Sequence, residues 1–152
     1  MLVGQKEPVF PAMWSTQNTF SMLALGDLAE CFKKVMEERE AHFYAQYLLT
    51  STHRPITFEE AMMVIGEKIG REVRMERLAF GEAVDALLMR MYGVEDATTV
   101  ERRRRRRDAA ESMIWFYNER GLVGNSNVLE WMLGRKATQF GEWVEGKLER
   151  GN

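Results

Sequence analysis

The order of the hydrophobic patterns along the chain constrains its fold more than any other feature. Between residues 19 and 93, short apolar or alternating stretches take turns with amphipathic stretches of helical period, and after residue 98 only helical patterns follow. Strands are predicted at 19–25, 42–50 and 72–80, and helices at 26–40, 57–71, 81–93, 98–120, 127–134 and 139–150. The order predicts an α+β or partial α/β domain with a mostly helical C-terminal half, preceded by an extended or irregular lead-in over residues 1–18.

Local signals place several helix ends. Thr57 and Glu60 have the spacing of a capping box, in which each side chain accepts the other residue's backbone N–H. Gly70 is placed to end that helix. Asp27 is the predicted N-cap of the first helix, and Cys31 lies on its apolar face, where we expect it to be ordinary core.

Composition bounds the class of protein. The 152 residues fit one domain, and 45% hydrophobic with 29% charged residues is typical of a globular protein. Basic and acidic side chains nearly balance, with a net charge of -2, which argues against nucleic acid as the main partner. Polar residues at 5–7 interrupt any signal peptide, and no long apolar run suggests a membrane span. We therefore expect a cytoplasmic location, with the nucleus as the alternative and no membrane contact.

Six consecutive arginines, residues 102–107, stand in the first half of the predicted long helix. At about 100° per residue they wrap around the helix and cannot share one face. We interpret the run as a solvated helix end, with the C-terminal half of the helix docked through an apolar stripe. The alternative is contact with a phosphate or an acidic partner, for which the candidates are Arg102, Arg103, Arg106 and Arg107.

The residues give no sign of catalysis. Gly66 with Gly70, and Gly121 with Gly124, lack the strand-to-helix context of a dinucleotide-binding loop. The two histidines are far apart in sequence and have no neighbouring ligand pair, so we predict no metal site. No tyrosine has a lysine four residues later, which excludes the catalytic pair of short-chain dehydrogenases. No catalytic residue is therefore predicted.

Three stretches and their spacing resemble a known family. They are residues 19–36, 47–78 and 108–144, with the landmarks "LGD", "ITFEEA" and "MLGRKATQFGEW". The pattern resembles the C-terminal half of NmrA-like proteins of the fungal type, which are atypical members of the short-chain dehydrogenase superfamily. The resemblance covers about Thr19 to Val144.

The resemblance implies a fold with two lobes that have different binding functions. NmrA-like proteins have an N-terminal Rossmann lobe that binds NAD(P) and a smaller C-terminal lobe that closes the substrate cleft. Residues 19–150 would then be the substrate-binding lobe, a partial Rossmann-type α/β lobe, with the nucleotide-binding lobe absent. No cofactor would bind to this chain alone. The candidates for lining the cleft are Trp115, Tyr117 and Asn118, for which the alternative is core packing with a hydrogen-bonded tip.

Three functions follow as expectations. The first is a non-catalytic module for small-ligand binding, regulation or protein interaction. The alternative is a subunit or fragment of an NAD(P)-dependent oxidoreductase that needs a partner lobe, and the third is a nucleic-acid accessory protein using the arginine run. Without a Rossmann sheet, the strand at residues 19–25 would expose an edge, so we expect a homodimer or a partner protein to cover it.

Overall fold

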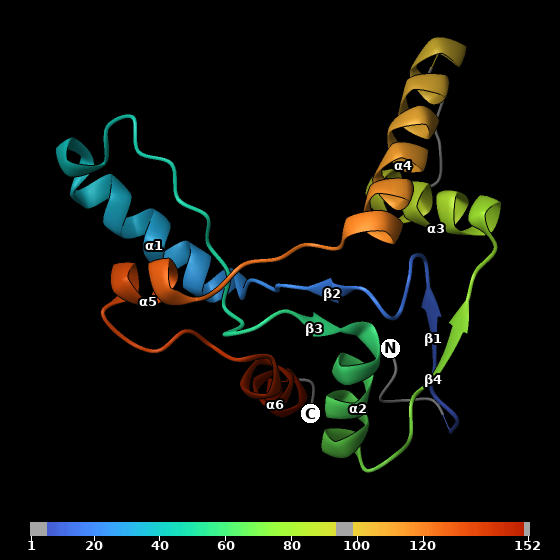
Figure 1. Ribbon diagram of the computed structural model, residues 1–152, viewed down its shortest axis with the longest axis horizontal. Helices are drawn as coiled ribbons and strands as arrows, with labels where there is room; N and C mark the ends of the chain where they lie inside the picture. The colour runs from blue at the N-terminus through green and yellow to red at the C-terminus, as the bar shows by residue number, and fades with distance from the viewer. Residues whose placement is uncertain (1–5, 94–98, 151–152) are drawn as a thin grey trace.

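The computed structural model describes residues 6–93 and 99–150, which form six α-helices, a short 3₁₀ helix and four short strands (Figure 1). The predicted α+β class with mostly helical content is confirmed. The elements are β1 (Val9–Ala12), β2 (Thr19–Phe20), α1 (Leu25–Glu37), η1 (Arg39–His42), β3 (Ile56–Thr57), α2 (Phe58–Ile69), β4 (Arg74–Arg77), α3 (Phe80–Tyr92), α4 (Val100–Arg120), α5 (Asn127–Leu133) and α6 (Phe140–Arg150). Among the described residues, no helix has both the length and the apolar character needed to cross a membrane.

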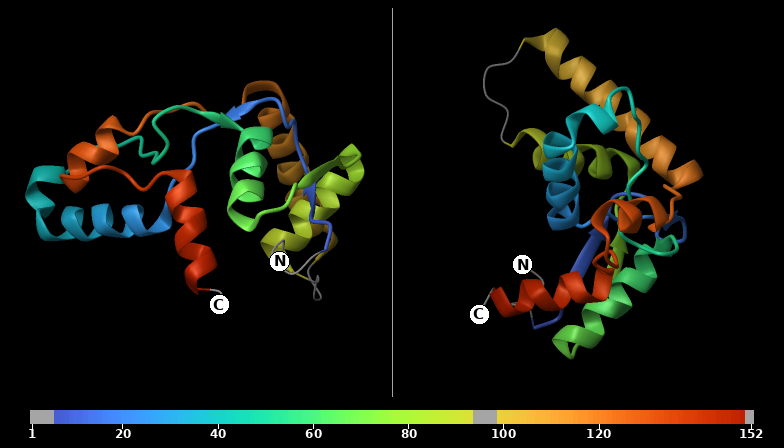
Figure 2. Two further views of the ribbon diagram at one scale, coloured as in Figure 1. Left: turned by 90° about the horizontal axis from the view of Figure 1, so that it is seen from below. Right: turned by 90° about the vertical axis from the view of Figure 1, so that its left-hand side faces the viewer.

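The helices pack in three pairs, and each pair has its own small core. Figures 1 and 2 show α1 with α5 at one end, α3 with α4 at the other, and α2 with α6 between them. Three separate clusters of buried side chains lie within these pairs. They centre on Cys31 and Leu129, on Ala61 and Val73, and on Val84 and Ile114. The burial of Cys31 confirms its predicted place in the core.

The first sheet pairs the first strand of the chain with the last. β1 lies parallel to β4, from Val9 opposite Arg74 to Ala12 opposite Arg77. Of the two predicted alternatives for the lead-in, extended or irregular, the extended one holds for Val9–Ala12 and the irregular one is wrong there. Local pattern did not reveal this strand because its partner lies far along the chain, and Pro11 reads as a strand breaker. Proline is tolerated at the edge of a sheet, where its missing N–H is not needed.

The strand predicted at residues 19–25 is shorter than expected and is bonded on both sides. Only Thr19 and Phe20 form β2, which pairs antiparallel with β3 through Thr19 opposite Thr57. On the other side, Leu122 donates its N–H to Thr19 O at 3.1 Å and accepts from Ser21 N at 2.7 Å. The prediction that this strand leaves an open edge is therefore wrong, because the segment after α4 covers it.

The chain continues from β2 as an extended stretch that binds a further segment. Met22 O accepts a hydrogen bond from Ser51 N at 2.7 Å, and Ala24 N donates to Ser51 Oγ at 2.9 Å. We call residues Thr19–Ala24 the central segment. It lies between β3, the stretch at residues 50–52 and the stretch after α4.

The strand predicted at residues 42–50 does not form. The 3₁₀ helix η1 runs into a turn, closed by a 3.2 Å hydrogen bond from Ala45 N to His42 O. Tyr44 has a φ of 59°, in the left-handed region that a residue with a Cβ seldom adopts. The strand prediction rested on the alternating pattern, but no strand in the described residues pairs with this stretch. A strand without a partner leaves its backbone groups unbonded, and the chain turns instead.

Both ends of α2, which carry local signals, are where the sequence placed them. The capping box of α2 is confirmed, since Glu60 N donates to Thr57 Oγ1 at 3.1 Å and Thr57 N donates to Glu60 Oε2 at 2.9 Å. Gly70 ends the helix with a φ of 66°. In α4 the buried residues are Ala110 and Ile114, which confirms docking by the C-terminal part. These signals act within a few residues, so tertiary context did not override them.

Two glycines let the segment after α4 approach the central segment. Gly121 has a φ of 62°, and a Cβ there would lie 2.3 Å from Thr19 O. A Cβ on Gly124 would lie 2.7 Å from Thr50 Cγ2. Gly121 and Gly124, which lack the context of a dinucleotide-binding loop, thus have a packing role.

Replacing Gly121 by alanine should lower the free energy of unfolding by about 2 kcal/mol or more, because alanine is strained at this φ and its Cβ overlaps a backbone oxygen. Urea denaturation would measure the change. The matched control is Gly81→Ala, at a helical position with open space, which should be neutral or slightly stabilising. Equal effects of the two substitutions would contradict this account of the close approach.

Candidate functional site

A buried carboxylate joins three segments that are distant in sequence. Asp27 lies in the first turn of α1 and its side chain is 2% exposed. Its Oδ2 accepts hydrogen bonds from Ser51 Oγ at 3.1 Å and from Thr138 N at 2.8 Å. Its Oδ1 accepts from Thr138 Oγ1 at 2.8 Å and from Arg135 Nη2 at 3.0 Å. The four donors match the accepting capacity of an ionised carboxylate.

The electrostatics of this junction favour the charged form of Asp27. Burial by itself raises the pKa of the carboxyl, but the hydrogen bonds from Thr138, Arg135 and Ser51 outweigh it and hold the pKa below its ordinary value. Arg135 also binds Glu30 at 2.7 Å on the surface. The junction fixes the start of α1 against the loop between α5 and α6.

Sequence reasoning assigned Asp27 a different role. The predicted N-cap is wrong, because α1 begins at Leu25 and its N-cap is Ala24, which has no side-chain cap. From inside the helix, the Asp27 side chain reaches across to the 135–139 loop. The available signal was helical spacing, since Asp27 lies four residues before the buried Cys31 and therefore on the same inward face. An aspartate on an inward face requires buried donors.

A second polar cluster superficially resembles hydrolytic machinery. Ser126 Oγ lies 2.7 Å from His53 Nδ1, which lies 3.6 Å from Glu130 Oε1. In a catalytic triad the histidine uses one ring nitrogen for the nucleophile and the other for the acid. Here Nδ1 faces both groups, and Ser126 is 1% exposed. The cluster therefore braces the start of α5.

The histidines belong to separate clusters. His42 Nδ1 lies 2.7 Å from the Tyr47 hydroxyl, and its Nε2 lies 3.6 Å from a carboxylate oxygen of Glu38. His53 lies beside Ser126. Across residues 6–93 and 99–150, no group of three or more His, Cys, Asp or Glu side chains is gathered in a way that could hold a metal ion.

The three predicted cleft residues do not form one surface. The Trp115 side chain points to solvent, at 63% exposed. The ring of Tyr117 lies 5.1 Å from that of Trp14 and 5.8 Å from that of Phe20, within an aromatic cluster. Asn118 Oδ1 accepts a 2.7 Å hydrogen bond from Ser15 N. Tyr117 and Asn118 thus hold the lead-in against α4, and a role in a cleft stays a prediction.

The arginine run divides into residues with different surroundings. Arg105 pairs with Glu101 at 2.6 Å, and Arg107 pairs with Asp85 of α3 at 2.8 Å. The guanidinium of Arg106 lies 4.2 Å from the centroid of the Tyr92 ring. Of the four predicted anion contacts, Arg103 and Arg107 line a groove between α3 and α4, while Arg102 and Arg106 do not. The groove also includes Arg104, which sequence reasoning left out.

The α1 end of the molecule carries exposed apolar side chains on two neighbouring elements. On α1 they recur at helical spacing, at Leu25, Ala29, Phe32 and Met36. We call these four residues the α1 stripe. The stretch at residues 43–49, which has the alternation of a strand, exposes Phe43, Tyr44 and Leu48. Exposed apolar side chains that lie close together make this end a candidate interaction surface.

Comparison with known proteins yields no match, either to a protein-family model or to a curated protein sequence. The NmrA-like resemblance therefore stays a prediction from the sequence. What the chain can do has to be argued from its own geometry.

Replacing Asp27 by alanine should lower the free energy of unfolding by about 3 kcal/mol at neutral pH, because Ser51, Thr138 and Arg135 lose a buried, charged acceptor. The pKa of Asp27 is lower in the folded than in the unfolded chain. Its contribution is therefore present above the unfolded pKa of about 3.9 and is lost as the pH falls through the folded pKa. Urea denaturation over a pH series should show that the difference in unfolding free energy between wild type and Asp27→Ala becomes smaller as the pH falls.

Glu30→Ala is the matched control, since Glu30 binds the same arginine from an exposed position and should matter much less. Equal losses for the two variants, or a gap for Asp27→Ala that does not narrow in acid, would contradict a buried ionised carboxylate.

Proposed function

We propose that this chain is a non-catalytic interaction module, the substrate-lobe half of an NmrA-like architecture, which docks by its α1 end onto a separate sheet-bearing lobe. The proposal rests on two features that lie beside each other. One is the exposed apolar face of α1, and the other is the strand-like stretch at residues 43–49, which has no strand partner in the described residues. The partner supplies a sheet edge for residues 43–49 and an apolar face for the α1 stripe.

The strand-like stretch supports this choice of partner. Phe43, Ala45, Tyr47 and Leu49 alternate as in a strand with one buried face. In the structure the stretch instead begins with a turn at Tyr44, whose left-handed backbone costs of order 1–3 kcal/mol. Pairing with a sheet edge would satisfy the backbone groups and relieve the turn.

The accessible surface of the molecule also supports docking. It amounts to 10845 Å², whereas a compact monomer of 17.7 kDa exposes about 7,900 Å² by the usual scaling with mass. The excess of roughly 2,900 Å² is larger than the about 800 Å² that each partner contributes to a standard interface. The chain is therefore more open than a compact monomer of its mass, which leaves surface available to a partner.

The NmrA-like part of the proposal rests on two sequence landmarks that meet in space. Asp27 of "LGD" binds Arg135 and Thr138 of "GRKAT". The β1–β4 pair adds to this, because parallel strands normally belong to larger sheets covered on both faces. Both features fit a lobe that continues into a Rossmann-type neighbour.

Replacing Phe32 by glutamate should abolish self-association of the purified chain. Without its partner lobe, the α1 stripe should drive concentration-dependent association, and a charge at its centre removes the apolar contact. Sedimentation velocity would measure the association. Hydrogen exchange should show residues 43–49 protected in the associated form and unprotected in the Phe32→Glu monomer.

Met63→Glu is the control, because Met63 is similarly exposed but lies on α2, outside the α1 stripe. It should leave association unchanged. A wild-type chain that stays monomeric at all concentrations, with hydrogen exchange unaffected by Phe32→Glu, would refute docking through the α1 end.

NADPH should not bind to the chain alone. Three of the four glycines in the two pairs are close-packed: a Cβ on Gly66 would lie 2.8 Å from Arg71 O, and Gly121 and Gly124 approach Thr19 and Thr50. Their backbones are not open to a pyrophosphate. A fluorescence titration with NADPH should show no saturable change. Saturable binding would instead favour the alternative, a part of an NAD(P)-dependent oxidoreductase.

A further inference from the structure

The sheet formed by β1 and β4 has an edge that can take another strand. Arg74 N donates to Pro8 O at 3.0 Å, so the backbone groups of Arg74 point toward β1. Successive residues of a strand present their backbone groups to opposite edges, and the N–H and C=O groups of Met75 and Arg77 therefore face away from β1. In the described part of the chain, no other strand pairs with β4.

The outer edge of β1 is less suited to a further strand. Because Pro8 faces β4, the alternation of the strand turns Pro11 outward, and proline has no N–H to donate. A parallel sheet of two strands is also at the lower limit of size, since parallel strands are normally found in larger sheets. The place for a further strand is therefore the edge of β4.

A groove of about 630 Å³ lies beside this edge, between α2 and β4. Its apolar part consists of Met62 and Met63 of α2 with Val73 and Met75. Met63 is 60% exposed, so part of this surface is open to a ligand. Phe10 and Met75 lie on the face of the sheet that packs against α2. A strand added to β4 would therefore place every second side chain over the groove.

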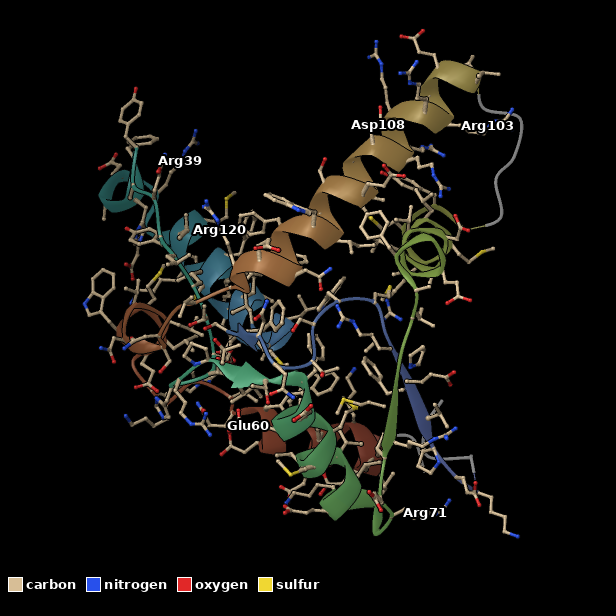
Figure 3. All side chains as sticks on the ribbon, turned by 45° about the vertical axis from the view of Figure 1, so that its right-hand side comes forward. Arg39, Glu60, Arg71, Arg103, Asp108 and Arg120 are labelled. Atoms are coloured by element: carbon tan, nitrogen blue, oxygen red, sulfur yellow. The ribbon has the colours of Figure 1, made fainter. Side chains whose placement is uncertain are left out.

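The groove is acidic where α2 turns into β4. Figure 3 shows Arg71 in this turn, and the groove lining there also includes Glu67 and Glu72. Among the described residues, neither of these glutamates has an ion-pair partner. With Glu59 at the start of α2, the lining carries three carboxylates and one guanidinium, a net charge of -2 with Arg71 counted in full. Neither arginine of β4 lines the groove.

We propose that β4 accepts an extended segment of a partner protein as a third strand of the sheet. An apolar side chain of the segment lies on Met63 and Met75, and a basic side chain near the start of β4 pairs with Glu67. This mode of recognition takes its affinity from backbone hydrogen bonds and its specificity from alternate side chains. The inference does not rest on docking through α1, because it uses a different helix and a different hydrophobic cluster.

The test uses the full chain and the fluorescein-labelled peptide Lys-Thr-Val-Thr-Val-Thr-Lys, in which lysine and valine share one face of a strand. Fluorescence anisotropy should show saturable binding, and hydrogen exchange should show that the peptide protects the amides of Met75 and Arg77. Glu67→Lys should weaken binding by about tenfold, because it reverses the charge beside the peptide lysine. Glu149→Lys is the matched control, with the same change of net charge at an exposed position of α6 outside the groove, and it should bind as the wild type does.

Methylation of the peptide backbone tests the strand pairing itself. Methyl groups on the amide nitrogens of the valines remove N–H groups from one edge of the peptide strand, and methyl groups on those of the threonines remove them from the other. One of the two methylated peptides should lose about tenfold in affinity, and the other should keep most of it. Equal affinities of the two methylated peptides, or equal binding by the Glu67→Lys and Glu149→Lys variants, would overturn the proposal.

The Phe32→Glu variant separates this edge from the α1 end, and it should bind the peptide as the wild type does. Loss of peptide binding in this variant would place the peptide at the α1 end and overturn the proposal. Self-association of the variant that the peptide reverses would overturn it too, because a second copy of the chain would then occupy the edge of β4.

Discussion

The central segment, Thr19–Ala24, is the element on which the arrangement of the helix pairs depends. Its backbone bonds β3 on one side and Leu122 on the other, and then continues to Ser51. α1 starts where the segment ends, α2 starts directly after β3, and Leu122 follows α4. One extended stretch thus orients a helix from each of the three pairs. Because its partners lie on both edges, neither a shift of register nor an added strand is compatible with the observed bonding.

The Asp27 carboxylate completes this arrangement at the α1 end. Burying a charge costs several kcal/mol unless its donors are in place, and here the donors come from two segments distant from α1 in sequence. All four hydrogen bonds form only when α1, residues 50–52 and the 135–139 loop meet. The carboxylate therefore contributes geometric specificity as well as stability, and it holds the α1 stripe in a defined orientation on the surface.

The sequence predicted what depends on neighbouring residues and missed what depends on distant partners. The capping box at Thr57 and the glycine that ends α2 were correct because both act within one turn of helix. The strand at residues 42–50 was wrong because alternation describes a face and not a partner. Asp27 was given the wrong role because three of its four donors, on Arg135 and Thr138, lie over a hundred residues away. For the arginine run, only the contact with α3 could separate Arg103, Arg104 and Arg107 from the others.

The two ends of the molecule are joined to its middle in different ways (Figure 2). The α3–α4 end is held by aromatic packing, in which Trp14 and Tyr117 contact Phe20. The α1 end is held by hydrogen bonds to the central segment and to Asp27. Coupling between two sites requires an element with two arrangements that both sites bias. The central segment is bonded on both edges in one register, so it is a poor switch. We therefore expect the proposed docking at the α1 end to leave the packing of α3 against α4 unchanged.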